Sequence, residues 1–214
     1  ENADVVVRMP TGAGVGAGPF HSQSNEAWFA HTPGLKVVYP ATPFEAKGLL
    51  AAAIEDPNPV MFFEYKALYR SLNGNVPKDY YTLPIGKAVV HQEGTDISII
   101  TYGMGVHWAQ EVAADSDASI EIINLRTLLP LDTETIFESV RKNGKVVVLH
   151  EDCMTGGIGG EISALINENC FQYLDAPVKR VASLDTPVPF AIPLEEKFLP
   201  KDRLVETLDA LLRY

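Results

Sequence analysis

Residues 12–39 read GAGVGAGPFHSQSNEAWFAHTPGLKVVY, a glycine-rich loop that leads through Pro19 and Phe20 to His21. Glycine at every second position from 12 to 18 allows backbone conformations that other residues resist, and the proline stiffens the approach to the histidine. The apolar run 35–39 that follows predicts a strand. We interpret the loop as an active-site wall that makes His21 available for chemistry.

Similar apolar runs recur along the chain and alternate with helical patterns. The strand-like runs cover residues 5–7, 35–39, 60–63, 88–90, 97–102, 120–123, 146–149 and 178–181. Helical patterns cover residues 42–56, which open on a capping box, and 132–142, and others begin near 160 and 202. Strands that alternate with helices favour a mainly parallel, doubly wound α/β sheet.

The polar stretch 73–79 interrupts this alternation, which begins afresh after it. We interpret the stretch as a linker between two α/β units, at residues 1–76 and 77–214. The chain begins with Glu rather than Met, and its first strand follows almost at once. Its first residue is therefore expected to lie inside a domain, and no targeting signal is inferred from it.

Composition excludes several classes of protein. The net charge of −11 repels phosphate backbones and anionic membranes, so we expect neither nucleic-acid nor membrane binding, and rather a basic protein partner. Cys153 and Cys170 lack the spacing of a metal site, which indicates buried thiols in a reducing compartment. The longest apolar run, near 48–54, is far shorter than the ~20 residues of a membrane span, so we expect a soluble protein.

Other readings of the motifs stay open or are disfavoured. His21 alone is also compatible with a hydrogen-bonded loop histidine. Ser22 and Ser24 adjoin it, but neighbours in sequence rarely form a triad and no G-x-S-x-G elbow occurs. Gln23 is interpreted as an amide that holds the loop and can touch a substrate, and His31 as a supporting turn residue.

Two further segments could bind ions. Residues 155–160, TGGIGG, precede a helix and could offer amide groups to an anion, although close packing of the helix on a sheet is favoured. The loop at 12–18 is a poor dinucleotide fingerprint, because positions 17 and 19 are not glycine. Residues 53–58, AIEDPN, end a helix where free carbonyls meet side-chain oxygens, which suits either a hard cation or a simple cap.

The segment around His21 resembles the catalytic-histidine segment in the β subunit of thiamine-diphosphate-dependent 2-oxoacid dehydrogenases. The resemblance continues through HTPGLKVV at 31–38, PFEAKGLL at 43–50, IEDPNP at 54–59, NLRT at 124–127 and LDAPV at 174–178. It implies an incomplete pyrimidine-binding domain over 1–76 and a transketolase C-terminal-like domain over 77–214. The glutamate that activates the thiamine ring would lie in the missing first half of the former.

The resemblance also implies roles for single residues. His21 would reach the thiamine-bound substrate, with Phe20 and Gln23 in the same active-site loop. Asp175 and the carboxylate of Tyr214 match positions that face the small basic binding domain of the acyltransferase core. A structural potassium ion would be held by oxygens of Ala53, Ile54, Asp56 and Asn58.

The implied activity is oxidative decarboxylation of a branched-chain 2-oxoacid or pyruvate, with transfer of the acyl group to lipoyl-lysine. HSQS at 21–24, FFE at 62–64 and LYR at 68–70 look more like the branched-chain members. Thiamine diphosphate and magnesium would be held mainly by an α subunit or α half. A second β copy would complete a heterotetramer that also meets the lipoyl domain, in the bacterial cytoplasm or the mitochondrial matrix.

Two alternatives remain. Transketolase and deoxyxylulose-phosphate synthase share this domain order, but their sugar phosphates call for more basic pocket residues than this acidic chain offers. The chain could also be a non-catalytic module that only scaffolds assembly. By itself the chain is expected to be inactive.

Overall fold

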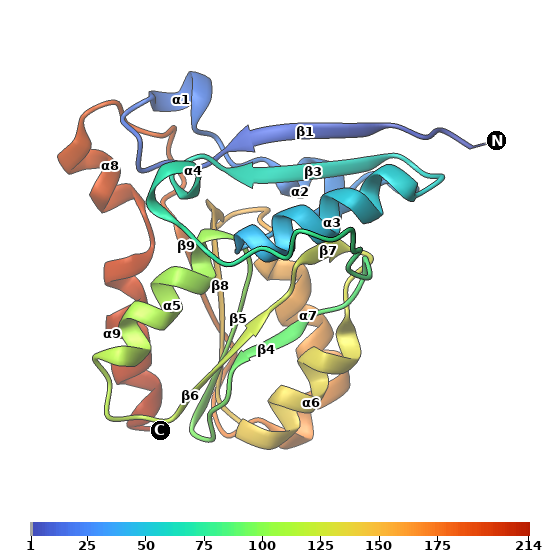
Figure 1. Ribbon diagram of the computed structural model, residues 1–214. Coiled ribbons are helices and arrows are strands. Elements are labelled where there is room, and N and C mark those ends of the chain that lie inside the picture. The colour runs from blue at the N-terminus through green and yellow to red at the C-terminus, as the bar shows by residue number, and fades with distance from the viewer. Residues whose placement is uncertain (1) are drawn as a thin grey trace.

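The computed structural model describes residues 2–214, which form two β-sheets flanked by helices (Figure 1). The first sheet has the order β1-β3-β2-β7 and comprises β1 (Val6–Thr11), β2 (Lys36–Val38), β3 (Val60–Tyr65) and β7 (Thr127–Leu129). The second has the order β4-β6-β5-β8-β9 and comprises β4 (Val89–Gln92), β5 (Ile97–Thr101), β6 (Ile120–Asn124), β8 (Val146–Cys153) and β9 (Lys179–Ser183). The α-helices are α1 (Gly18–His21), α2 (Glu26–Ala30), α3 (Pro43–Glu55), α4 (Leu68–Ser71), α5 (Met104–Ala114), α6 (Thr133–Asn143), α7 (Gly159–Cys170), α8 (Ile192–Phe198) and α9 (Lys201–Leu212).

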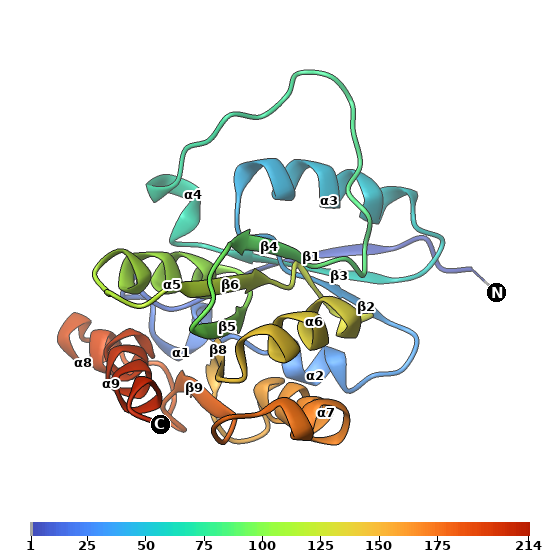
Figure 2. The ribbon, with the colours of Figure 1, turned by 90° about the horizontal axis from the view of Figure 1, so that it is seen from below.

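The second sheet is covered on both faces, as Figure 2 shows. Its strands β5, β6, β8 and β9 run parallel, and only the edge strand β4 is antiparallel. Because alternate residues of a strand point to opposite faces, Ile99 packs towards α5 and α9 whereas Ile100 packs towards α6 and α7. The prediction of a doubly wound α/β unit is confirmed here.

The first sheet packs its two faces against different partners. Leu49 and Ala53 of α3 cover one face, over Val38 and Phe62. The other face belongs to the same apolar cluster as β5, α6 and α7 of the second unit. The core is therefore continuous between the two sheets, and β1 lies at the outer edge of the first sheet among the described residues.

The start of α3 follows the predicted capping signal with one difference. Pro43 is the first helical residue and the Thr42 hydroxyl accepts the Glu45 N–H at 3.2 Å. The Glu45 carboxylate, however, reaches back to the Ala41 N–H at 2.9 Å rather than to Thr42. The other contacts of the Glu45 carboxylate explain this difference from a capping box, because the carboxylate also accepts from Arg126 Nε of the second unit at 2.6 Å. A buried carboxylate needs such partners, so this ion pair fixes how the units meet.

Strand β7 was not predicted. Its three residues follow the second unit's β6, yet they pair antiparallel with β2 of the first sheet. The segment after the predicted linker also packs on the first unit, because the Leu83 N–H donates to the Gly48 carbonyl at 3.0 Å. Two segments that follow the predicted linker, around Leu83 and at Thr127–Leu129, thus pack on the first unit, and a division at 76/77 stays a prediction.

The short helices and α5 were also absent from the predicted elements. Four-residue and five-residue helices such as α1 and α2 are too short to show a helical period. Helix α5 begins after Gly103, whose φ is +54°, and contains Gly105, whose added Cβ would lie 2.0 Å from the Thr101 hydroxyl. Glycine has a low helix propensity, so a sequence argument from propensity does not predict a helix that contains glycines required for close packing.

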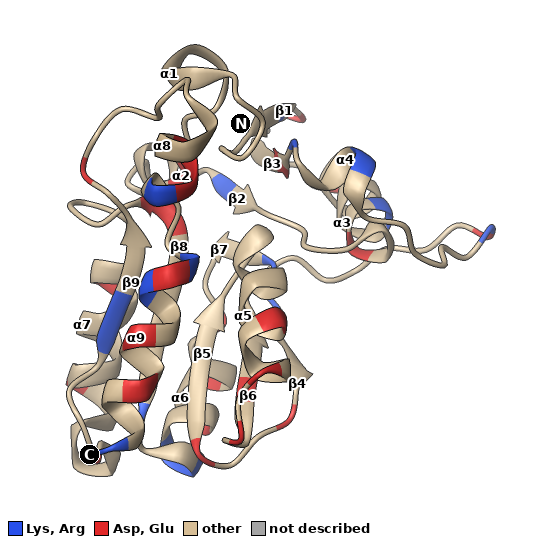
Figure 3. Cartoon of the chain, turned by 90° about the vertical axis from the view of Figure 1, so that its left-hand side faces the viewer, with Lys and Arg blue, Asp and Glu red and all other residues tan. Residues whose placement is uncertain are grey.

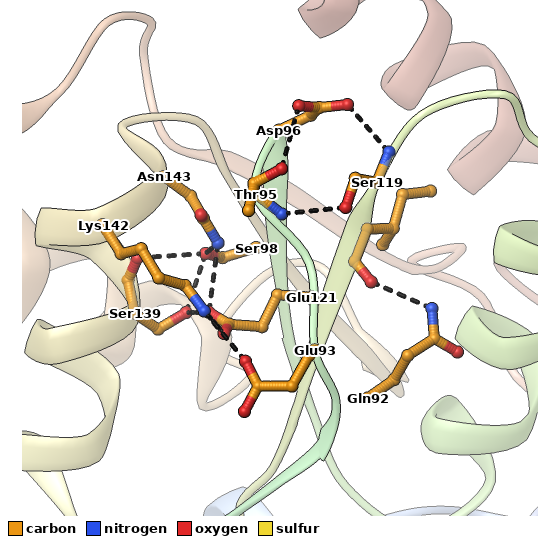
Figure 4. Close-up of polar contacts among 11 residues, drawn as sticks. Gln92, Glu93, Thr95, Asp96, Ser98, Ser119, Glu121, Ser139, Lys142 and Asn143 are labelled. Carbon is orange, nitrogen blue, oxygen red and sulfur yellow. Dashed lines mark hydrogen bonds and ion pairs between the residues drawn. The ribbon is translucent and has the colours of Figure 1, made fainter.

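A polar cluster ties α6 to the amino ends of β5 and β6 (Figure 4). The buried Glu121 carboxylate accepts from Asn143 Nδ2 at 3.0 Å and pairs with Lys142. Ser98 and Ser139 bond to each other at 2.7 Å. Its carboxylate, ammonium and hydroxyl groups bond to one another, and it lies at the opposite end of the sheet from the glycine loop, so we assign it to folding.

Candidate active site

The glycine loop adopts the conformation that its sequence predicts. Gly12, Gly14, Gly16 and Gly18 have φ angles of +97°, +87°, +66° and +60°, which favour glycine. An added Cβ would also lie 2.5 Å from the Tyr65 ring at position 12 and 2.3 Å from the Phe190 ring at position 18. Figure 3 shows α1 without Lys, Arg, Asp or Glu.

The second unit holds the loop. The Glu195 carboxylate of α8 accepts from the N–H groups of Gly14 and Gly16, each at 2.9 Å. The Glu151 carboxylate, at the carboxyl end of β8, accepts from the Ala13 N–H at 2.9 Å. The loop therefore lies at the carboxyl ends of the second sheet's strands, where α/β folds commonly place their ligands.

His21 ends α1, and its side chain is exposed. It borders an open hollow with Met9, Phe20, Gln23 and Lys66. The Lys66 ammonium donates to the backbone carbonyls of Gly12 (3.0 Å) and His21. The backbone at the histidine is thus fixed while its imidazole faces open space, which suits a group that must reach a bound molecule.

The neighbours of His21 differ in their exposure. Phe20 is 81% exposed and Gln23 is exposed too, with its backbone carbonyl accepting from the Thr11 hydroxyl at 2.5 Å. Ser22 is fully buried and its hydroxyl has no protein partner among the described residues. The buried position of Ser22 agrees with the sequence argument against a serine nucleophile at this residue.

Sequence reasoning missed a group of buried acids beside the loop. The Glu26 carboxylate accepts from the Tyr102 hydroxyl at 2.7 Å across the two units. Burial, with a smaller contribution from the charge of Asp152, raises the pKa of Glu26 to about 8. Burial likewise raises the pKa of Glu151 to about 7. Glu26 and Glu151 lie far apart in the sequence and form no motif, so only the fold reveals that both lie beside the loop.

The glycines of 155–160 serve packing. A Cβ on Gly157 or Gly159 would lie 2.5 or 2.6 Å from the ring of His150, a fully buried residue of β8. Burial lowers the pKa of His150 to about 4, so its ring is neutral at neutral pH. These contacts favour the packing interpretation over an anion site.

The residues expected to hold a cation lie at the end of α3. Asp56 accepts from the N–H and Nδ2 of Asn58 at 3.0 and 2.9 Å and pairs with Lys36. Burial by itself would raise the pKa of Asp56, but the hydrogen bonds from Lys36 and Asn58 outweigh burial and lower this pKa. Ala53 is buried whereas Ile54 is 66% exposed. The Asp56 carboxylate is thus already paired, which leaves backbone carbonyls as the main candidate ligands.

The two residues expected to dock a partner are exposed. Asp175 lies next to Gly144 at the end of α6, and its N–H donates to that glycine's carbonyl at 2.9 Å. Tyr214 is 71% exposed at the C-terminus, which lies at the end of the molecule opposite α1 in Figure 1. The structure separates these residues from the hollow beside His21.

Comparison with known proteins adds two family matches. Residues 2–71 match the pyrimidine-binding domain of transketolase, and residues 86–205 match the transketolase C-terminal domain. A split-gene transketolase solved as an inactive β4 tetramer superposes over 99% of this chain and 67% of its own, with a TM-score of 0.78 and 24% identity. That likeness concerns the fold. No helix among residues 2–214 is long and apolar enough to cross a membrane.

Two relatives come from Bacillus subtilis. The β subunit of 2-oxoisovalerate dehydrogenase is 50% identical over 94% of this chain and 63% of its own length. The β subunit of the pyruvate dehydrogenase E1 component is 44% identical over 98% of this chain and 66% of its own length. The chain therefore spans less than two thirds of the length of these relatives.

Proposed function

Because the chain belongs to the transketolase family through its pyrimidine-binding and C-terminal domains, we propose that it is part of the β subunit of a 2-oxoacid dehydrogenase decarboxylating component. The single observation that carries the proposal is the exposed His21, presented by a loop that both units hold. The relatives named for this activity support it.

Thiamine diphosphate is the proposed cofactor, and it would supply the nucleophilic carbon that cleaves the bond beside the oxo group. The residues around His21 fit the reacting end of such a cofactor, because they offer an imidazole and the exposed Phe20 ring. They do not fit its diphosphate, since Glu195 occupies the amide groups of the glycine loop. We therefore assign the diphosphate and its magnesium ion to an α subunit.

His21 supplies the proton chemistry in this proposal. An imidazole can donate to negative charge that develops on the substrate or return a proton to it. Lys66 holds the backbone carbonyl of His21, so the backbone that carries the ring is already ordered before substrate binds. A lipoyl-lysine arm would then accept the acyl group.

The hollow beside His21 favours an apolar 2-oxoacid over a sugar phosphate. Among the described residues, those that line the hollow are mainly apolar or neutral. The one ammonium among them, on Lys66, donates to two backbone carbonyls. Between the two 2-oxoacids, the higher identity to the 2-oxoisovalerate enzyme than to the pyruvate enzyme of Bacillus subtilis favours the branched-chain substrate. Steady-state decarboxylation by the complete enzyme is expected to give a higher kcat/KM for 2-oxoisovalerate than for pyruvate. Turnover of xylulose 5-phosphate instead would favour the transketolase alternative.

The α subunit is proposed to cover the apolar side chains around His21. Phe20 and Phe190 have ring centroids 6.1 Å apart, and they are 81% and 58% exposed. Ile192 and Leu194 of α8 are 62% and 61% exposed beside them. Large apolar side chains exposed together are typical of a protein interface.

Potassium is expected to raise the melting temperature of the complete protein more than sodium does. We propose that carbonyl oxygens near Ala53, Ile54 and Asn58 hold the ion, with Asp56 ordering the loop through Asn58. An ion that binds only the folded state stabilises it by mass action. Melting curves at matched ionic strength measure this, and identical curves in the two salts would contradict a selective site.

Changing Asp175 to Asn, or removing Tyr214, is expected to weaken binding to the basic binding domain of the acyltransferase. Both carboxylates are solvent-exposed, so the losses should shrink as salt is added, with slower association as their main cause. Binding kinetics at low and moderate salt measure this. Unchanged rates in both variants would place the docking surface elsewhere. Asp209→Asn, at an exposed position of α9, is the matched control.

A further inference from the structure

Glu195 makes an unusual set of contacts for a helical carboxylate. It is 2% exposed on α8, a helix near the C-terminus, yet its bonds go to a loop about 180 residues earlier in the chain. One oxygen accepts from the N–H groups of Gly14 (2.9 Å) and Val15 (3.4 Å), and the other accepts from Gly16 (2.9 Å). Three successive amides of the loop thus converge on one carboxylate.

Such a concave run of amides normally attracts an anion. Gly14 and Gly16, at φ of +87° and +66°, turn these amides towards one side. The anion here belongs to the chain itself, so the loop is closed to a phosphate by an internal ligand. The carboxylate therefore organises the loop rather than leaving it available to a cofactor.

The loop's other supports lie at its two ends. The Ala13 carbonyl accepts from the Tyr65 hydroxyl at 2.9 Å, and the Lys66 ammonium donates to the carbonyls of Gly12 at the start of the loop and of His21 at the end of α1. Beyond the Glu195 contacts the chain enters α1, where Phe190 fills the space that a side chain at Gly18 would take. Among the described residues, Glu195 is thus the one whose side chain holds the middle of the loop that leads into His21.

We propose that Glu195 is a positioning residue: through the amides of residues 14–16 it sets the place of α1, and so the reach of the His21 imidazole. The proposal rests on the catalytic role proposed for His21. A misplacement of about 1 Å can slow an enzyme by roughly 10²-fold, so a carboxylate remote from the substrate can control turnover.

Glu195→Gln in the complete enzyme tests this, because the amide group would set an N–H donor against the loop's own N–H donors. We expect kcat to fall by about 10- to 100-fold while KM changes little. Glu196→Gln, on an exposed neighbour in the same helix, is the matched control and should behave as wild type. Amide hydrogen exchange of residues 14–20 should accelerate in the first variant only. Unchanged exchange or an unchanged kcat would overturn the proposal.

Coupling to His21 separates positioning from a merely structural role. The double variant Glu195→Gln/His21→Ala is expected to have the kcat of His21→Ala alone, because the two residues act as one unit. If the losses of kcat in the two single variants multiply in the double variant, the positioning role is overturned and the proposed function stays intact. A His21→Ala enzyme with full activity would overturn the proposed function and this role together. If Glu195→Gln does not fold, Gly16→Ala disturbs the same contact from the loop, and the same outcomes apply.

Discussion

His21→Ala is expected to slow 2-oxoacid decarboxylation by roughly 10²–10⁴-fold in the assembled enzyme, the usual loss when acid-base assistance is removed. The imidazole is exposed at the end of α1 and its backbone is held by Lys66, so truncation removes the proton donor without disturbing the core. Thiamine diphosphate should still bind, because the proposed diphosphate site lies on the α subunit. Steady-state kinetics and calorimetric titration with the cofactor measure the two effects.

His31→Ala is the matched control. This residue is also exposed and follows α2 at a turn, so its loss should leave kcat within a few-fold of wild type. If the His21→Ala enzyme keeps full activity while His31→Ala also does, the hollow beside α1 is not the reacting site.

The second large effect concerns stability and pH. Glu26 ionises near pH 4.5 in an unfolded chain, but burial raises its pKa to about 8 in the folded protein. Between these values the unfolded state has lost a proton that the folded state keeps, so the free energy of unfolding falls as pH rises from about 4.5 to 8. Glu26→Gln removes this penalty and should stabilise the protein at pH 8 on the order of 2 kcal/mol.

Urea unfolding at several pH values measures this effect. The stabilisation by Glu26→Gln should vanish well below pH 4.5, where the wild-type carboxyl is protonated in both states. His150 acts in the opposite direction, because its pKa of about 4 makes the folded state lose stability as pH falls below 6.5. Glu138→Gln, at an exposed position of α6, is the control. A parallel pH profile for wild type and Glu26→Gln would show that Glu26 is ionised in the folded protein.

The sequence predicted those parts of the fold whose signals are local. The capping residue Thr42 and the left-handed Gly144 after α6 define helix ends by chemistry within a few residues. Strand β7 could not be predicted in this way, because its pairing with β2 joins residues about 90 positions apart. The same limit applies to the ion pair of Glu45 with Arg126, which is invisible until the units are packed.

The residues of the candidate site also fall into those with a local sequence signal and those that meet only in the folded protein. His21 and Phe20 could be chosen because the glycines that present them are adjacent in sequence. Glu195, Glu151 and Glu26 could not, since each meets the loop or its surroundings only through tertiary packing. Asp56 shows the converse, because its acceptor-rich neighbourhood was recognised but its Lys36 partner was not.

Complementation tests the central claim most directly. The complete subunit that contains this chain would be mixed with an α subunit, thiamine diphosphate, magnesium and an oxidised lipoyl domain as electron and acyl acceptor, and carbon dioxide release from 2-oxoisovalerate would be measured. We expect neither subunit alone to decarboxylate the substrate and the mixture to do so, with activity that saturates at equal subunit concentrations. A stable complex of the two subunits that releases no carbon dioxide from any 2-oxoacid would contradict the claim and favour a module that only scaffolds assembly.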